Sequence, residues 1–295
     1  MARSQEGILA PLPKFARFTT FQLVSGADPA AALIALKKEP LGARVVVGIG
    51  HACAARLGRG VPGLHELEAL SGPSVTVPST PAALWCFLRG DVDPGELLLR
   101  ERELAARVSP AFEIESATTA FKFGEGRDLS GYMDGTENPK GDDALEAAFV
   151  RDAGPHLDGG SFVAAQRWRH DLGALARRPA RERDLVVGRR IADNTEIADA
   201  PESAHVKRTA QESFAPEAFV LRRSMPWAEG ERAGLVFVAF GCSLRAFEVQ
   251  LRRMAGLEDG ITDALFSFTR PETGAAFFCP PIDDDGRLDL GALGI

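Results

Sequence analysis

The clearest strand of the sequence is Gly234-Leu235-Val236-Phe237-Val238-Ala239-Phe240-Gly241. It is apolar throughout, rich in β-branched and aromatic residues and bounded by glycines, which is typical of a buried strand. A stretch of the same character stands in the first half of the chain, Ala83-Leu84-Trp85-Cys86-Phe87-Leu88-Arg89-Gly90. Two matching strands, one in each half, predict a fold built from two similar units.

The elements around these two strands follow the same order. In the first half we expect a strand at 16–24, a helix at 28–38, strands at 44–50 and 83–90, a helix at 93–108 and a strand at 111–123. In the second half we expect a strand at 160–168, helices from 170 and 179, strands at 218–222 and 234–241, a helix from 243 and a strand at 274–279. Strand, helix, strand, strand, helix, strand is the ferredoxin-like order. We therefore predict an α+β fold, with two ferredoxin-like halves (1–150 and 151–295) forming a dimeric α+β barrel-type domain of antiparallel sheets and peripheral helices.

Composition excludes several classes of protein. The net charge of −7 gives no basic surface for nucleic acid. There is no run of about 18 apolar residues for a membrane span, and no secretory signal is evident. The four cysteines are widely spaced, without a Cys-x-x-Cys pair. They indicate buried thiols in a reducing compartment, so we expect a cytoplasmic protein.

One loop stands out, Gly131-Tyr132-Met133-Asp134-Gly135-Thr136-Glu137-Asn138-Pro139-Lys140-Gly141. Its glycines and proline exclude a helix interior or a central strand. The carboxylate of Asp134 stands before a glycine, where a rigid ligand can come close. The alternative is an ordinary turn in which Asp134 bonds its own backbone.

Among the five histidines, His205 is set apart by the small residues Ser203 and Ala204 before it. They would let a flat macrocycle approach the ring. The alternative is a surface histidine in a charged loop. His170 precedes Asp171-Leu172 at a helix start, where a structural role is preferred.

The long motif, Gly-x-x-Asp-Gly followed by Thr-Glu-Asn-Pro, resembles the signature of the dye-decolourising peroxidases, a family of haem peroxidases. Three further segments resemble that family in the same order, namely 188–197, 203–205 and 220–226. The similarity is greatest to the compact bacterial B-type branch.

The resemblance implies a haem b cofactor with His205 as the iron ligand. Arg222 would lie over the iron, and Asp134 would carry the proton that must move between the peroxide oxygens when a ferryl intermediate forms. Asp263 would accept a hydrogen bond from His205, with a helix cap as the alternative. Arg189 would pair with a haem propionate.

The chain departs from the family pattern just after Arg222. Some members carry Asn where this chain has Ser224, and Asp where it has Arg223. The shorter hydroxyl of Ser224 would assist peroxide only through a water.

The predicted function is therefore a haem peroxidase that uses hydrogen peroxide to oxidise dyes, phenolics or other small organic reductants. Alternatives are a haem-binding or haem iron-handling protein without peroxidase turnover, and a barrel with no cofactor. We expect a homo-oligomer. The end of the chain, 288–295, loosely resembles tails that direct family members into encapsulin shells, although a solvated terminus is the preferred interpretation.

Overall fold

The computed structural model describes residues 4–38 and 40–295. Its main feature is a ten-stranded sheet in which all of the paired strands run antiparallel. The first half contributes four strands in the spatial order β6-β1-β5-β2. Their bounds are β1 Phe15–Leu23, β2 Val45–Gly50, β5 Leu84–Gly90 and β6 Phe112–Phe121.

The second half repeats this arrangement in the order β12-β7-β10-β8, with β9 also paired to β10 and β11 to β7. The bounds are β7 Ser161–His170, β8 Leu221–Arg222, β9 Met225–Glu229, β10 Arg232–Gly241, β11 Thr269–Pro271 and β12 Ala275–Cys279. In each half the fourth strand lies beside the first, which is the ferredoxin-like topology. The predicted α+β fold with two ferredoxin-like halves is confirmed.

The two halves are joined through their edge strands. Phe277 and Phe278 of β12 pair with Gly50 and Ile49 of β2, so the two sheets are continuous. At the other ends β6 packs against β9, and no ladder joins them within the described residues. A boundary near residue 150 remains a prediction; it would fall between α4 (Gly141–Ala148) and β7.

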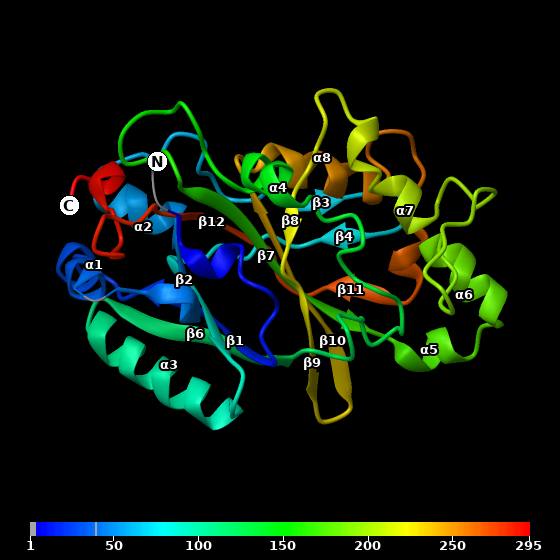
Figure 1. The fold of residues 1–295 in the computed structure, drawn as a ribbon, viewed down its shortest axis with the longest axis horizontal. Helices are drawn as coiled ribbons and strands as arrows, with labels where there is room; N and C mark the ends of the chain where they lie inside the picture. Colours follow the sequence, from blue (N-terminus) through cyan, green and yellow to red (C-terminus); the bar gives the residue numbers. More distant parts are fainter. Residues whose placement is uncertain (1–3, 39) are drawn as a thin grey trace.

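Helices lie at both ends of the sheet (Figure 1). α1, α2 and α3 lie at the left of that view, and α5, α6 and α7 at the right. Besides α4, the α-helices have these bounds: α1 Ala30–Lys37, α2 His51–Arg56, α3 Pro94–Val108, α5 Leu172–Ala176, α6 Ala180–Val187, α7 His205–Arg208 and α8 Arg245–Met254. Short 3-10 helices are η1 Glu6–Ile8, η2 Gly42–Arg44, η3 Gln211–Ser213, η4 Ala264–Ser267 and η5 Gly291–Leu293. No helix among the described residues is long and apolar enough to cross a membrane.

Burial on both faces explains the continuous apolar strands. Along β5, Cys86 and Leu88 belong to one core with α1, α3 and α8, while Trp85 and Phe87 belong to a second core on the opposite face. In this second core Trp85 stacks on Phe277 of β12, with ring centroids 5.9 Å apart. Because successive side chains point to opposite faces and both faces are buried, apolar residues follow one another along the strand without polar alternation.

Two local expectations are wrong. The stretch 218–222 forms a strand only at Leu221–Arg222, because side chains occupy the backbone groups before it: Gln211 Oε1 accepts from Val220 N at 2.9 Å, and Gln250 Nε2 donates to Ala218 O at 2.7 Å. The end of the chain is not solvated, since Leu288 and Leu290 are fully buried.

Candidate active site

An apolar cavity lies between the second half of the sheet and helices α6, α7 and α8. It is open to solvent on one side and is lined by side chains of both the sheet and these helices. Its walls are mostly aliphatic and aromatic: Val187, Val220, Leu235, Phe237, Phe247, Leu251, Met254, Leu265 and Phe268. The polar groups that line it include His205, Asp134, Arg222, His170 and Asp128.

His205 enters the cavity from the first position of α7 and is held by Asp263. Its Nδ1 lies 2.7 Å from Asp263 Oδ2, and the Asp263 side chain is 0% exposed. A carboxylate only accepts, so this contact assigns the proton to Nδ1 and leaves a lone pair on Nε2. Nε2 has no protein partner among the described residues.

Asp263 performs both of the tasks considered for it from the sequence. While Oδ2 accepts from the histidine, Oδ1 accepts from Leu265 N at 2.8 Å and caps η4. The next residue ties the two segments together through its backbone, because Ala264 N donates to Ser203 O at 2.7 Å. These contacts fix the Asp263 carboxylate independently of its hydrogen bond to the His205 ring.

Asp134 and Arg222 also line the cavity. Arg222 Nε lies 3.8 Å from Asp134 Oδ1, which is an ion pair but too long for a hydrogen bond. Asp134 Oδ1 also accepts from Gly135 N at 2.7 Å, as in the turn expected from the sequence. Its other oxygen, Oδ2, has no hydrogen bond within the described part of the chain.

Asn138 positions Arg222, a role that the sequence did not reveal. Its Oδ1 accepts from Arg222 N at 2.8 Å and its Nδ2 donates to Arg222 O at 3.1 Å. The Asn138 amide thus makes the two hydrogen bonds to the Arg222 backbone that a neighbouring strand would otherwise make. The only sequence signal was the Asn inside the Gly131 loop, whose distant partner cannot be read from spacing.

His170 lines the same cavity but has no free ring nitrogen. Nε2 lies 2.9 Å from Asp128 Oδ1 and Nδ1 lies 2.6 Å from Thr269 Oγ1. Burial acts to raise the pKa of Asp128, but the hydrogen bond and charge of His170, with hydrogen bonds from Ser130, outweigh it and lower that pKa. These contacts suit a structural pair.

Two residues expected at the site, Arg189 and Ser224, do not line this cavity. Arg189 Nη2 bonds Glu137 at 2.5 Å and Glu196 at 3.0 Å. Ser224 is buried, and its Oγ accepts from Val238 N at 3.3 Å. Ser224 and Asp134 do share the wall of a much smaller cavity.

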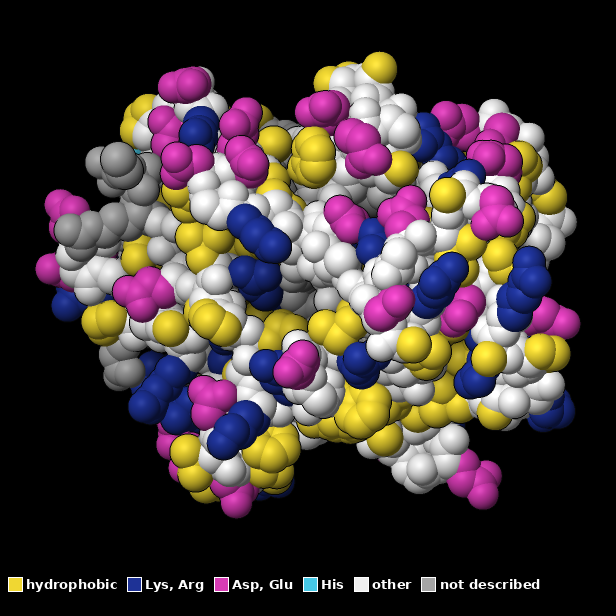
Figure 2. All heavy atoms as spheres, turned by 45° about the vertical axis from the view of Figure 1, so that its right-hand side comes forward, with side chains coloured by type: hydrophobic (Ala, Val, Ile, Leu, Met, Phe, Trp, Pro, Cys, Tyr) yellow, Lys and Arg dark blue, Asp and Glu magenta, His cyan; other side chains and the backbone are white. Residues whose placement is uncertain are grey.

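Side chains of both charges are intermixed on the face that carries α5, α6 and α7 (Figure 2). No field of a single sign therefore covers this face. The electrostatics of the site are set by the few charged groups within the cavity.

An apolar cavity with a carboxylate-held imidazole and a carboxylate–guanidinium pair in its lining defines the site of a cofactor-dependent enzyme on an α+β fold. The family model described as Dyp-type peroxidase, C-terminal, matches residues 125–284. The chain belongs to the dye-decolourising peroxidase family.

Individual relatives agree with this assignment. A dye-decolorizing peroxidase of Mycobacterium tuberculosis is 31% identical over 303 residues, covering 96% of this chain and 90% of the relative. One from Mycolicibacterium paratuberculosis is 30% identical, covering 75% of this chain but 64% of the relative. The solved structure of a variant of DypB from Rhodococcus jostii in complex with haem has a TM-score of 0.85 at 26% identity, covering 95% of this chain and 97% of that chain.

Proposed function

We propose that this chain is a haem peroxidase that reduces hydrogen peroxide and oxidises an organic reductant such as a dye or a phenol, with haem b in the apolar cavity. One observation supports the fit most strongly. His205 presents an unpartnered Nε2 to the cavity while a buried carboxylate fixes its Nδ1. A proximal histidine of a haem protein needs this arrangement.

His205 would hold the iron, and Asp263 would make the ring a stronger electron donor. The aliphatic and aromatic walls suit the macrocycle and exclude water. When bound, the haem supplies the iron at which peroxide is reduced to water. The other tasks of the reaction belong to side chains of this protein.

Asp134 would take the proton from one peroxide oxygen and return it to the other. Its Oδ2 is available, because its hydrogen bond from Gly135 N is made by Oδ1. The guanidinium of Arg222 stays protonated in proteins and cannot act as a base. Its task would be to stabilise negative charge on the peroxide. Asn138 would hold the Arg222 backbone in register with Asp134.

The proposed tasks of Arg189 and Ser224 are more indirect. Arg189 would pair with a haem propionate in exchange for one of its two glutamates, which are 62% and 55% exposed. That exchange replaces one carboxylate with another. Ser224 would act through a water in the small cavity that it shares with Asp134.

Partners and compartment follow from the resemblance and from the thiols. Free, buried Cys53, Cys86 and Cys279 suit a reducing compartment such as the cytoplasm. Homo-oligomer formation and loading into an encapsulin shell remain predictions. Burial of Leu288 and Leu290 argues against the tail as a free targeting peptide.

The assignment of the iron ligand is tested by His205→Ala beside His170→Ala. We expect His205→Ala to lose tight haem binding, or to change the Soret band to that of a weakly ligated haem. His170→Ala should keep the band, since both of its ring nitrogens already have protein partners. Absorbance spectra of the haem-reconstituted variants give the answer, and the reverse result would exclude His205 as the ligand.

A further inference from the structure

The helix that carries His205 is a single turn, His205–Arg208. A helix of this length is not stable by itself. Its own backbone bonds are few, with Arg208 N donating to Ala204 O at 3.1 Å and Thr209 N to His205 O at 3.0 Å. Contacts from other elements must therefore fix its position and rotation.

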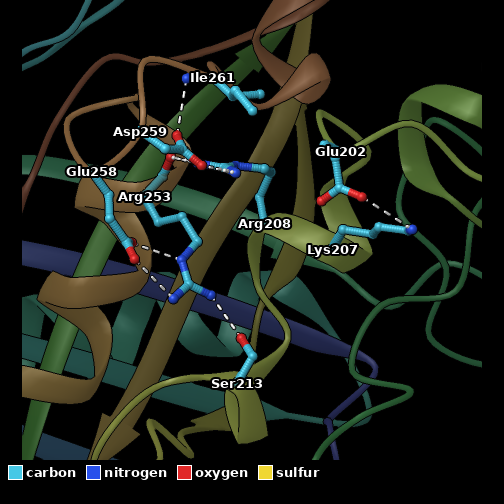
Figure 3. Close-up of polar contacts among 8 residues, drawn as sticks. All are labelled: Glu202, Lys207, Arg208, Ser213, Arg253, Glu258, Asp259 and Ile261. Carbon is cyan, nitrogen blue, oxygen red and sulfur yellow. Dashed lines mark hydrogen bonds and ion pairs between the residues drawn. The ribbon is translucent and has the colours of Figure 1, made fainter.

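The segment between α8 and η4, residues 255–263, holds this helix at both ends. Asp263 binds His205 at the first position of α7. Asp259 binds Arg208 at the last position through a bidentate pair, with Nη1 to Oδ2 and Nη2 to Oδ1 both at 2.7 Å (Figure 3). Two carboxylates of one segment thus bind both ends of one helical turn.

Arg208 makes this contact from a buried position, whereas Asp259 lies at the surface with its side chain 39% exposed. The Arg208 side chain is 4% exposed, and its Nη2 also donates to Arg253 O near the end of α8 at 2.8 Å. Asp259 is oriented in turn by Ile261 N, which donates to Oδ1 at 2.9 Å (Figure 3). The hydrogen bonds from Arg208 and Ile261 lower the pKa of Asp259 to about 2, so the pair stays charged into strong acid.

We propose that the Arg208–Asp259 pair is a positioning clamp that sets the rotation of α7 and thereby keeps His205 Nδ1 on Asp263. This inference rests on the proposed function only for its effect on haem. Loosening the clamp would weaken the hydrogen bond at the ligand and release the cofactor more easily.

The same segment offers a matched control, Glu258. It precedes Asp259 and also binds an arginine, with Arg253 Nε 2.7 Å from Glu258 Oε2, but that arginine lies on α8 and reaches Ser213 (Figure 3). Glu258→Gln therefore removes a carboxylate of the same segment whose hydrogen bonds come from α8 and not from α7.

The test compares Asp259→Asn and Arg208→Lys with Glu258→Gln. Asp259→Asn removes the negative charge of the pair and Arg208→Lys removes its bidentate geometry, while each variant keeps a polar group at its position. We expect both to speed haem transfer to an acceptor protein about tenfold, the low end of the range for a direct outer-shell partner, because they act on His205 through α7. They should also raise the iron reduction potential, because a weaker hydrogen bond at Nδ1 makes His205 a less electron-rich ligand. Glu258→Gln should match the wild type.

A measurement on the haem-free chain separates this proposal from the ligand assignment. In ¹⁵N-histidine-labelled apoprotein, the downfield Nδ1–H resonance of His205 should be present in wild type and Glu258→Gln, and weakened in Asp259→Asn. An unchanged resonance in Asp259→Asn would overturn the clamp. A Soret band retained in His205→Ala would instead overturn the ligand assignment, while the apoprotein spectra would still decide the clamp.

Discussion

Asp263 is bonded through both carboxylate oxygens, to the His205 ring and to the Leu265 amide. The two bonds use different properties of the side chain. In an Asn side chain the amide oxygen can still cap η4. The amide nitrogen is only a donor, so it cannot accept the hydrogen bond from His205 Nδ1. Substitution by Asn therefore separates the two tasks.

We predict that Asp263→Asn raises the reduction potential of the bound haem by about 60 mV or more. A less electron-rich ligand favours the reduced iron, and a tenfold change in a one-electron equilibrium corresponds to about 59 mV. Spectroelectrochemical titration measures this. The control is Asp171→Asn, because Asp171 caps α5 through Ala174 N without touching His205. An equal potential in both variants would reduce Asp263 to a helix cap.

Arg223 illustrates a residue whose neighbours in sequence give no hint of its contacts. It follows Arg222 and adds a second positive charge, but it turns toward the first segment of the chain. Its Nε and Nη2 donate to Ile8 O and Leu9 O, both at 2.9 Å. Arg223 is therefore committed to this segment and does not replace Arg222.

Among the secondary-structure elements, those formed by local chemistry were predictable. The helix expected at 93–108 forms as Pro94–Val108, with Asp93 accepting from Gly95 N at 2.6 Å and proline in the first turn. β5 and β10 form where long apolar runs end at a glycine, Gly90 and Gly241. In these elements the capping, periodicity and burial signals all lie within a few residues of each other.

Elements fixed by distant side chains were not predictable. β8 is two residues long because Gln211 and Gln250 take the preceding backbone groups and Asn138 takes those of Arg222. β9 follows it and contains Pro226, which weakens any strand signal. At the site, the pairing of His205 with Asp263 spans 58 residues, so only the family resemblance suggested it.

For the molecule as a whole, the pairing of β2 with β12 joins the sheets of the two halves. Gly50 lies at this junction opposite Phe277, and a Cβ there would come within 1.9 Å of Ala82 O, a backbone atom. No side-chain movement can relieve that contact. The position of β2 against the segment that leads into β5 is therefore sensitive to a single methyl group, next to the junction with β12.

We predict that Gly50→Ala lowers the free energy of unfolding by more than about 2 kcal/mol. Because the halves share both cores, one transition should move as a whole when urea unfolding is followed by circular dichroism and by tryptophan fluorescence. Gly60→Ala is the control, since a Cβ there meets nothing within 4 Å. Two separate transitions, with only one shifted in Gly50→Ala, would show that the halves fold independently.

The central claim is that peroxide is reduced in the cavity bounded by His205, Asp134 and Arg222. Stopped-flow absorbance of the haem-loaded protein mixed with hydrogen peroxide tests it most directly. We predict that Asp134→Asn and Arg222→Leu both keep the Soret band and react more slowly than the wild type. Arg222→Leu should be the slower by at least about tenfold, or roughly 1.4 kcal/mol of barrier, because a water can replace the carboxylate whereas Arg223 is held elsewhere. A greater loss in Asp134→Asn would reverse this ranking, and wild-type rates in both variants would contradict the account.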